Sequence, residues 1–177
     1  NQIYFASSFG LIICDYLIID GKLKIYENQT ILNDSEVYDI KNMGDDIYIS
    51  SSRGLYKYNL AANKMKLIDS NIYYNIQIFE SYILASNKNL WYIDMFGREL
   101  ISNNINYFNT NSNGDKICAT DLNEIKIIDF DSKSEWFINL NQLNIDEPIY
   151  SIDCDDNWLW FPMSSGISFF KWSNYDK

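Results

Sequence analysis

Short apolar strands separated by polar turns run through the chain. In the clearest copy, turn-forming residues such as Gly44 and Asn63 separate four segments in which apolar and polar positions alternate. Those four segments are residues 37–40, 47–50, 55–59 and 64–68. Short strands joined by hairpin turns predict an antiparallel up-and-down sheet. We find no stretch of a dozen residues with the period of an amphipathic helix, so the pattern favours an all-β fold.

The same arrangement returns five times. The loop between the second and third strands of each copy carries one of five landmark residues, Gly10, Gly54, Asn89, Glu124 and Gly166. These positions lie 44, 35, 35 and 42 residues apart, and a strand-only period of this length is typical of propeller blades. We therefore expect a single all-β domain, a β-propeller of up-and-down four-stranded meander blades. Its repeats cover about residues 1–33, 35–69, 70–102, 103–141 and 147–177.

The first and last repeats are incomplete. The first repeat begins at its second strand, and the fifth stops after its third strand. A closed ring hides its strand edges by building one blade from both termini, but these two partial blades do not complete one another. We interpret the chain as an open segment of a larger ring. The alternative is a small closed ring with an irregular seam.

Composition and charge limit the classes of partner that the chain is suited to bind. The chain of 177 residues is 47% hydrophobic and 16% aromatic, which indicates a packed globular protein. Its net charge is −10, with 14 basic against 24 acidic residues, so nucleic acid and anionic membrane surfaces are poor partners. No apolar stretch approaches the roughly 20 residues that a membrane span requires. Cys14, Cys118 and Cys154 lie in or at the ends of apolar strands and are interpreted as small buried hydrophobes.

Two repeats carry a recognisable motif. Residues 149–172 and 45–59 each show an acidic turn, an apolar strand, a small polar loop, and then a glycine with a second apolar strand. This order resembles the two-component regulator propeller repeat, and the third repeat keeps its Asn89-Leu90-Trp91 step. Glu124 departs from the pattern because it replaces the loop glycine.

The resemblance implies a function and a location. Repeats of this family are best known from the periplasmic sensor regions of hybrid two-component systems. Those regions form large propellers that detect oligosaccharides and pass the signal to a histidine kinase through a dimer. The resemblance therefore implies a periplasmic or extracellular ligand-sensing segment, with a homodimer formed through the full-length protein.

Catalytic and metal chemistry find little support in the sequence. The chain has no histidine, which removes Ser-His-Asp and Cys-His catalysis and the commonest metal ligand. The carboxylates that could hydrolyse a glycoside belong to different blades or to turns, namely Glu36, Asp39, Asp153 and Asp155. Residues 153–157 lack the central Gly and closing Glu of a calcium loop and are interpreted as a turn. We expect a protein without enzymatic activity, metal or cofactor.

Binding is better supported. The turns between second and third strands lie on one face of a propeller, and they provide four candidate ligand-binding residues, Arg53, Lys88, Asp121 and Ser165. The planar fork of Arg53 suits a carboxylate or a sulfate, although these residues can also be ordinary solvated turns. The five tryptophans could stack on sugars, but packing between blades is the favoured interpretation. The preferred hypothesis is an oligosaccharide sensor. The alternatives are a protein-interaction scaffold and a polysaccharide-degrading enzyme.

Overall fold

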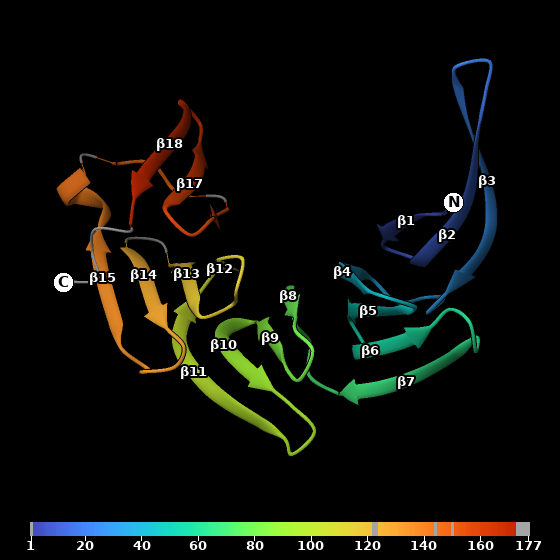
Figure 1. Ribbon diagram of the computed structural model, residues 1–177, viewed down its shortest axis with the longest axis horizontal. Coiled ribbons are helices and arrows are strands. Elements are labelled where there is room, and N and C mark those ends of the chain that lie inside the picture. Colours follow the sequence, from blue (N-terminus) through green and yellow to red (C-terminus); the bar gives the residue numbers. More distant parts are fainter. Residues whose placement is uncertain (1, 122–123, 144, 150, 173–177) are drawn as a thin grey trace. The chain divides into compact units, whose positions relative to one another are not determined.

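A computed structural model describes residues 2–121, 124–143, 145–149 and 151–172. Within these residues the chain forms five antiparallel sheets, and no backbone ladder joins one sheet to another (Figure 1). The predicted all-β blade architecture is confirmed. One turn of 3-10 helix, η1 (Leu140–Leu143), is the only helix in the described part of the chain. No helix there is long and apolar enough to cross a membrane.

Each sheet is a meander in which neighbouring strands follow one another along the sequence. The first sheet contains β1 (Gln2–Ser7), β2 (Gly10–Ile19) and β3 (Lys22–Ile31). The second contains β4 (Val37–Met43), β5 (Asp46–Ser51), β6 (Gly54–Asn59) and β7 (Lys64–Asp69). The third contains β8 (Asn75–Ile78), β9 (Ile83–Ser86), β10 (Lys88–Ile93) and β11 (Arg98–Ile105). The fourth contains β12 (Tyr107–Thr110), β13 (Lys116–Thr120), β14 (Glu124–Asp129) and β15 (Glu135–Asn139), and the fifth β16 (Asp153–Cys154), β17 (Trp158–Met163) and β18 (Gly166–Lys171).

Several strands differ from the sequence-based prediction, and β3 and β16 are two of them. Residues 22–26 and 30–32 were expected as separate strands, but β3 runs through both and pairs with β2 over its whole length. A register shift opposite Ile13 and Cys14 accommodates the extra residue, so the strand continues. In the fifth sheet the inner strand was expected over 149–154, whereas β16 contains only two residues. There the Asp153 carboxylate accepts a hydrogen bond from the Cys154 amide at 2.8 Å, a local bond of the kind that competes with a ladder.

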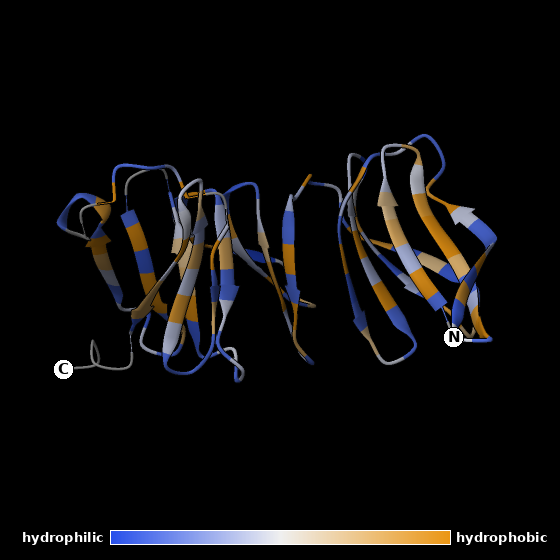
Figure 2. Ribbon diagram, turned by 90° about the horizontal axis from the view of Figure 1, so that it is seen from above, coloured by the Kyte–Doolittle hydropathy of each residue, from blue (hydrophilic) through white to orange (hydrophobic). Residues whose placement is uncertain are grey.

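Apolar and polar residues alternate along the strands, as the banding of Figure 2 shows. Within the described residues the apolar side chains build three clusters. By Cα proximity the chain divides into two compact units, 1–78 and 79–177, and the division falls after β8. The cluster of the first unit joins the first two sheets and includes Leu11, Ile13, Ile47 and Ile49. The second unit contains the other two. One includes Leu84, Leu90, Phe108 and Ile117, and the other Cys118, Ile127, Ile152 and Phe161. Each cluster lies between two neighbouring sheets, as expected for propeller blades.

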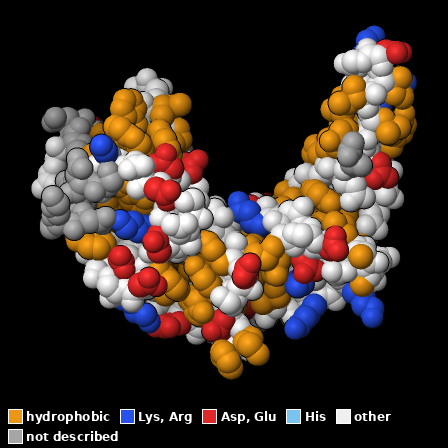
Figure 3. Space-filling view, in the orientation of Figure 1, with side chains coloured by type: hydrophobic (Ala, Val, Ile, Leu, Met, Phe, Trp, Pro, Cys, Tyr) orange, Lys and Arg blue, Asp and Glu red, His pale blue; other side chains and the backbone are white. Residues whose placement is uncertain are grey.

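The first sheet keeps apolar side chains exposed towards the hairpin that joins β2 to β3. Leu11 and Ile13, in the first half of β2, are fully buried, whereas Leu17 and Ile18 near its end are 55% and 70% exposed. Hydrophobic side chains consequently gather over the β2–β3 hairpin (Figure 3). Contiguous exposed apolar surface is unusual for an isolated domain. It is expected for the terminal blade of an open propeller segment.

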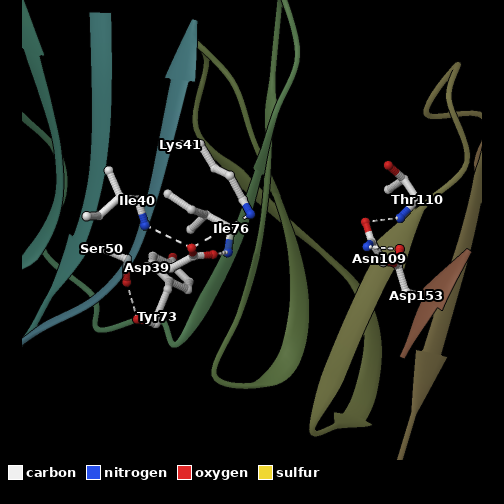
Figure 4. Close-up of polar contacts among 9 residues, drawn as sticks. All are labelled: Asp39, Ile40, Lys41, Ser50, Tyr73, Ile76, Asn109, Thr110 and Asp153. Carbon is white, nitrogen blue, oxygen red and sulfur yellow. Dashed lines mark hydrogen bonds and ion pairs between the residues drawn. The ribbon is translucent and has the colours of Figure 1, made fainter. Parts of the chain in front are cut away.

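Polar side chains on the innermost strands connect neighbouring sheets. The two carboxylate oxygens of Asp39 accept the amide protons of Ile40 and Ile76, each at 2.8 Å, and the second bond reaches from β4 to β8 (Figure 4). The same arrangement recurs between the fourth and fifth sheets, where Asn109 donates to Asp153 at 2.6 Å. Because no ladder crosses between sheets, these side chains provide hydrogen bonds there. Asp39 and Asp153 therefore have a structural role at these junctions.

An ion pair in the second blade predicts acid sensitivity. The Asp46 carboxylate accepts a hydrogen bond from Lys57 at 2.6 Å and another from the Asn59 amide at 2.7 Å. Both bonds lower the pKa of Asp46, and the bond from Lys57 has the larger effect. A lowered carboxyl pKa contributes stability above the unfolded value, and this contribution is lost as the pH falls through the folded pKa. Because both side chains are partly exposed, we expect a loss below about 1 kcal/mol. Urea unfolding at pH 6 and pH 3 should show a smaller acid loss for Asp46→Asn than for the parent chain, and equal losses would contradict the assignment.

Candidate ligand-binding edge

The turns between second and third strands share one construction. In the second blade the Ser51 hydroxyl donates to the Gly54 carbonyl at 3.0 Å and accepts the Arg53 amide at 3.2 Å. In the first blade Ser7 makes the matching bonds, to the Gly10 carbonyl at 2.7 Å and from the Phe9 amide at 3.2 Å. The turn therefore uses its own serine internally, and the side chain just before the glycine is left exposed.

Arg53 lies in a turn that is held next to a group of polar and aromatic side chains. The neighbouring Ser52 exchanges two hydrogen bonds with the backbone of Glu36, at 2.8 and 3.1 Å, which attaches the turn to the segment that enters β4. The Tyr38 hydroxyl donates to the Glu36 carboxylate at 3.2 Å. The Tyr38 ring packs edge-on against Tyr74, with ring centroids 5.1 Å apart. We call Glu36, Tyr38, Arg53 and Tyr74 the Arg53 cluster.

The Arg53 cluster has the chemistry of a saccharide site. Burial first, and then the Glu36 charge, raise the pKa of Tyr38, so its hydroxyl stays protonated at neutral pH. Tyr74 is 54% exposed and offers an aromatic ring to solvent. Within the described residues the Arg53 guanidinium has no hydrogen bond or ion pair. A cation, a carboxylate and an exposed ring at one edge of a sheet can together recognise an acidic sugar.

The other three predicted residues occupy the corresponding edges of their own blades. Lys88 was expected in a loop, but it is the first residue of β10 and has a positive φ of 79°, so Asn87 alone joins β9 to β10. The Asp121 carboxylate accepts the Glu124 amide at 3.0 Å and shapes its turn. The Ser165 amide donates to Glu147 at 3.2 Å. No hydrogen bond or ion pair within the described residues joins any two of the four predicted residues.

Sequence reasoning missed the aromatic part of the cluster. Tyr38 and Tyr74 precede or begin inner strands, in segments that were interpreted only as strand or connection. A glutamate in the connection that leads to an inner strand is a signal that could have been used. The Glu147 carboxylate accepts hydrogen bonds from the turn of its blade, and the bond from Ser164 lowers the pKa of Glu147. Glu36 contacts its turn through its backbone, and its carboxylate accepts from Tyr38. Within the described residues no group of three or more Cys, Asp or Glu side chains could hold a metal ion.

Solved structures confirm the fold. The N-terminal domain of Nup159 matches with a TM-score of 0.66 at 12% identity, over 92% of this chain and 49% of that one. The nidogen/laminin complex matches with a TM-score of 0.69 at 11% identity, over 96% of this chain and 73% of that one. The extracellular domain of the putative one component system BT4673 from B. thetaiotaomicron matches with a TM-score of 0.68 at 19% identity.

These matches establish a propeller-like architecture. The BT4673 match includes 95% of this chain but only 25% of the BT4673 chain. This chain likewise spans about half of the Nup159 domain. No family model matches the chain, and no curated protein does. Because all three identities are below 20%, function has to be argued from the site itself.

Proposed function

We propose that this chain is a non-catalytic ligand-sensing segment of a β-propeller that recognises an acidic oligosaccharide outside the cytoplasm. The Arg53 cluster is the observation that supports the proposal. It combines a guanidinium that makes no ion pair within the described residues, an exposed aromatic ring and a carboxylate on the edge predicted for binding.

The cluster favours a sugar that carries a carboxylate or sulfate. A guanidinium binds such a group through two parallel hydrogen bonds, and a charge-assisted pair contributes about twice as much as a neutral hydrogen bond. The Tyr74 ring can pack on the apolar face of a sugar ring, while the Glu36 carboxylate can accept from sugar hydroxyls. A neutral sugar would use only the last two contacts. We therefore expect acidic saccharides to bind more tightly.

The signalling role follows from the motif and one structural match. The repeats at 45–59 and 149–172 resemble the two-component regulator propeller repeat. The matching BT4673 chain is described both as a putative one component system and as a putative hybrid two component system. We propose that ligand binding at such edges is transmitted to a histidine kinase. The kinase would belong to the full-length protein or to its partner in a homodimer.

Replacing Arg53 with alanine tests the site. The acidic probes are tetragalacturonate and a chondroitin sulfate disaccharide, and the neutral probe is maltotetraose. We expect the Arg53→Ala variant to bind the acidic probes at least tenfold more weakly, a loss of about 1.4 kcal/mol. Isothermal titration calorimetry measures it. Arg98→Ala is the matched control, because Arg98 stacks over Trp91 at 4.7 Å, outside the cluster.

Each result of this titration decides something about the site. Equal affinity of the Arg53→Ala variant and the parent chain would remove Arg53 from the binding site. Equal losses from both arginine variants would indicate non-specific charge attraction. A chain that binds none of the three probes would count against an acidic saccharide as the ligand.

A protein-interaction scaffold is the second candidate, and one hairpin favours it. Met95 and Phe96, at the turn between β10 and β11, are each 88% exposed. The Asp94 carboxylate accepts the amides of Phe96 and Gly97, at 2.7 and 3.1 Å, and fixes this turn. A rigid turn that presents two large apolar side chains is suited to a pocket on another protein.

A further inference from the structure

Two cysteines from different blades meet in the interior of the second compact unit. The sulfur atoms of Cys118, on β13, and Cys154, on β16, lie 2.7 Å apart. Cys118 is fully buried and Cys154 is 8% exposed, within the apolar cluster that joins the fourth and fifth sheets. Their separation along the chain is 36 residues, so the contact is a product of blade packing.

Polar bonds independent of the thiols hold this contact in place. Asn109 lies opposite Cys118 in the β12–β13 register, and its amide donates to Asp153 at 2.6 Å. The same Asp153 oxygen accepts the amide of Cys154 at 2.8 Å. One hydrogen-bonded chain therefore runs from the partner of one cysteine to the backbone of the other (Figure 4 shows the Asn109–Asp153 bond).

We propose that Cys118 and Cys154 form a disulfide that links the fourth blade to the fifth. Two S–H bonds break and one S–S bond forms, with release of two protons and two electrons. An oxidised thiol–disulfide oxidoreductase or a disulfide of the glutathione type accepts the electrons and is reduced to two thiols. The 2.7 Å approach lies within about 0.7 Å of a covalent S–S bond, which is about 2.05 Å long.

The folded environment fixes when the bond forms. Burial raises the pKa of the Cys118 thiol, so the native state contains little of the thiolate that attacks a disulfide. Cys154 lies on β16, a strand of only two residues in the fifth sheet, and it reaches solvent when that sheet separates from the fourth. We therefore place oxidation before or during docking of the fifth blade, after which the bond is shielded from reductant.

The third cysteine provides an internal control. Cys14 is buried in the first sheet, which belongs to the other compact unit, and it makes no sulfur contact within the described residues. An odd number of cysteines therefore resolves into one linked pair and one free thiol. Disulfides persist in oxidising compartments, in agreement with the extracellular location proposed above, but the chemistry in vitro does not depend on that location or on any ligand.

Thiol counting tests the proposal directly. The parent chain, refolded with reduced and oxidised glutathione, is denatured and alkylated with iodoacetamide without reductant. We expect one labelled cysteine, Cys14, an intact mass about 2 Da below that of the reduced chain before alkylation, and tryptic peptides 117–126 and 134–171 joined by a reducible bond. Three labelled thiols, or a bond that includes Cys14, would overturn the assignment.

A melting experiment supplies a second readout on the same protein. The disulfide would close a loop between positions 36 residues apart. We expect Tm to be about 10 °C higher in the oxidised chain than in the same chain unfolded and refolded with dithiothreitol. Cys14→Ser should keep the full difference, whereas Cys154→Ala should abolish it. An unchanged Tm would contradict a stabilising cross-link. Formation of the disulfide in a chain that binds no saccharide would leave this proposal intact and reject only the proposed function.

Discussion

Gly54→Ala should destabilise the protein by about 4 kcal/mol, the sum of a strained backbone and an overpacked contact. Gly54 begins β6 with a φ of 121°, a conformation that L side chains rarely adopt. A Cβ at this position would lie 2.5 Å from the Asp69 carbonyl oxygen and 3.1 Å from a Leu67 methyl group. The backbone oxygen is fixed by the β6–β7 pairing, so it cannot move aside without breaking the ladder.

Gly166 gives the matched control for this substitution. Gly166 occupies the same place in the fifth blade with a φ of 146°. No heavy atom of the described residues lies within 4 Å of the position that a Cβ would take there. Gly166→Ala should therefore cost only the backbone term, about 1–2 kcal/mol. Urea unfolding followed by circular dichroism measures both variants. Similar losses in the two would mean that the Asp69 contact relaxes and that the close approach has no energetic weight.

Phe108→Ala should cost about 3–5 kcal/mol by leaving a cavity between the third and fourth sheets. Phe108 is 2% exposed on β12 and packs in the cluster that contains Leu84, Leu90 and Ile117. These sheets share no backbone ladder, so apolar packing is the main force between them. Because whole domains are stable by about 5–15 kcal/mol, a loss of this size should be visible as a large shift in the urea midpoint.

The same substitution on the surface is the comparison. Phe96 is 88% exposed at the turn between β10 and β11, and Phe96→Ala should change the free energy of unfolding by less than about 0.5 kcal/mol. A small loss for Phe108→Ala, equal to that of Phe96→Ala, would show that the cluster does not hold these sheets together.

Most of the fold could be predicted because strand alternation and turn residues are local signals. The limits of β5 and β6 fall within one residue of the segments predicted over 47–50 and 55–59. The long β3 could not be predicted, since a bulge carries the strand through polar residues that would otherwise end it. The short β16 could not be predicted either, since the apolar residues Ile149 and Ile152 precede it in the sequence.

The candidate site was predictable only in part. Arg53 follows from its place before a turn glycine, which is visible in the sequence. Tyr38 and Tyr74 are 36 residues apart and meet because the segment that leads to β8 packs beside β4 within the first compact unit. The Cys118–Cys154 contact is hidden for the same reason, and the sequence alone favoured small buried hydrophobes for all three cysteines.

The separation of the sheets bears on how such a chain can evolve. In the described residues no strand ladder crosses from one sheet to the next. The polar links between sheets are single side-chain hydrogen bonds, such as the one that Asp39 accepts from the Ile76 amide and the one that Asn109 donates to Asp153. Duplication or deletion of a whole repeat would therefore cut no ladder, and the new junction would need apolar faces that pack together and the same few polar groups. Recombination at blade boundaries can thus change the number of repeats in descendants of this gene while preserving every sheet.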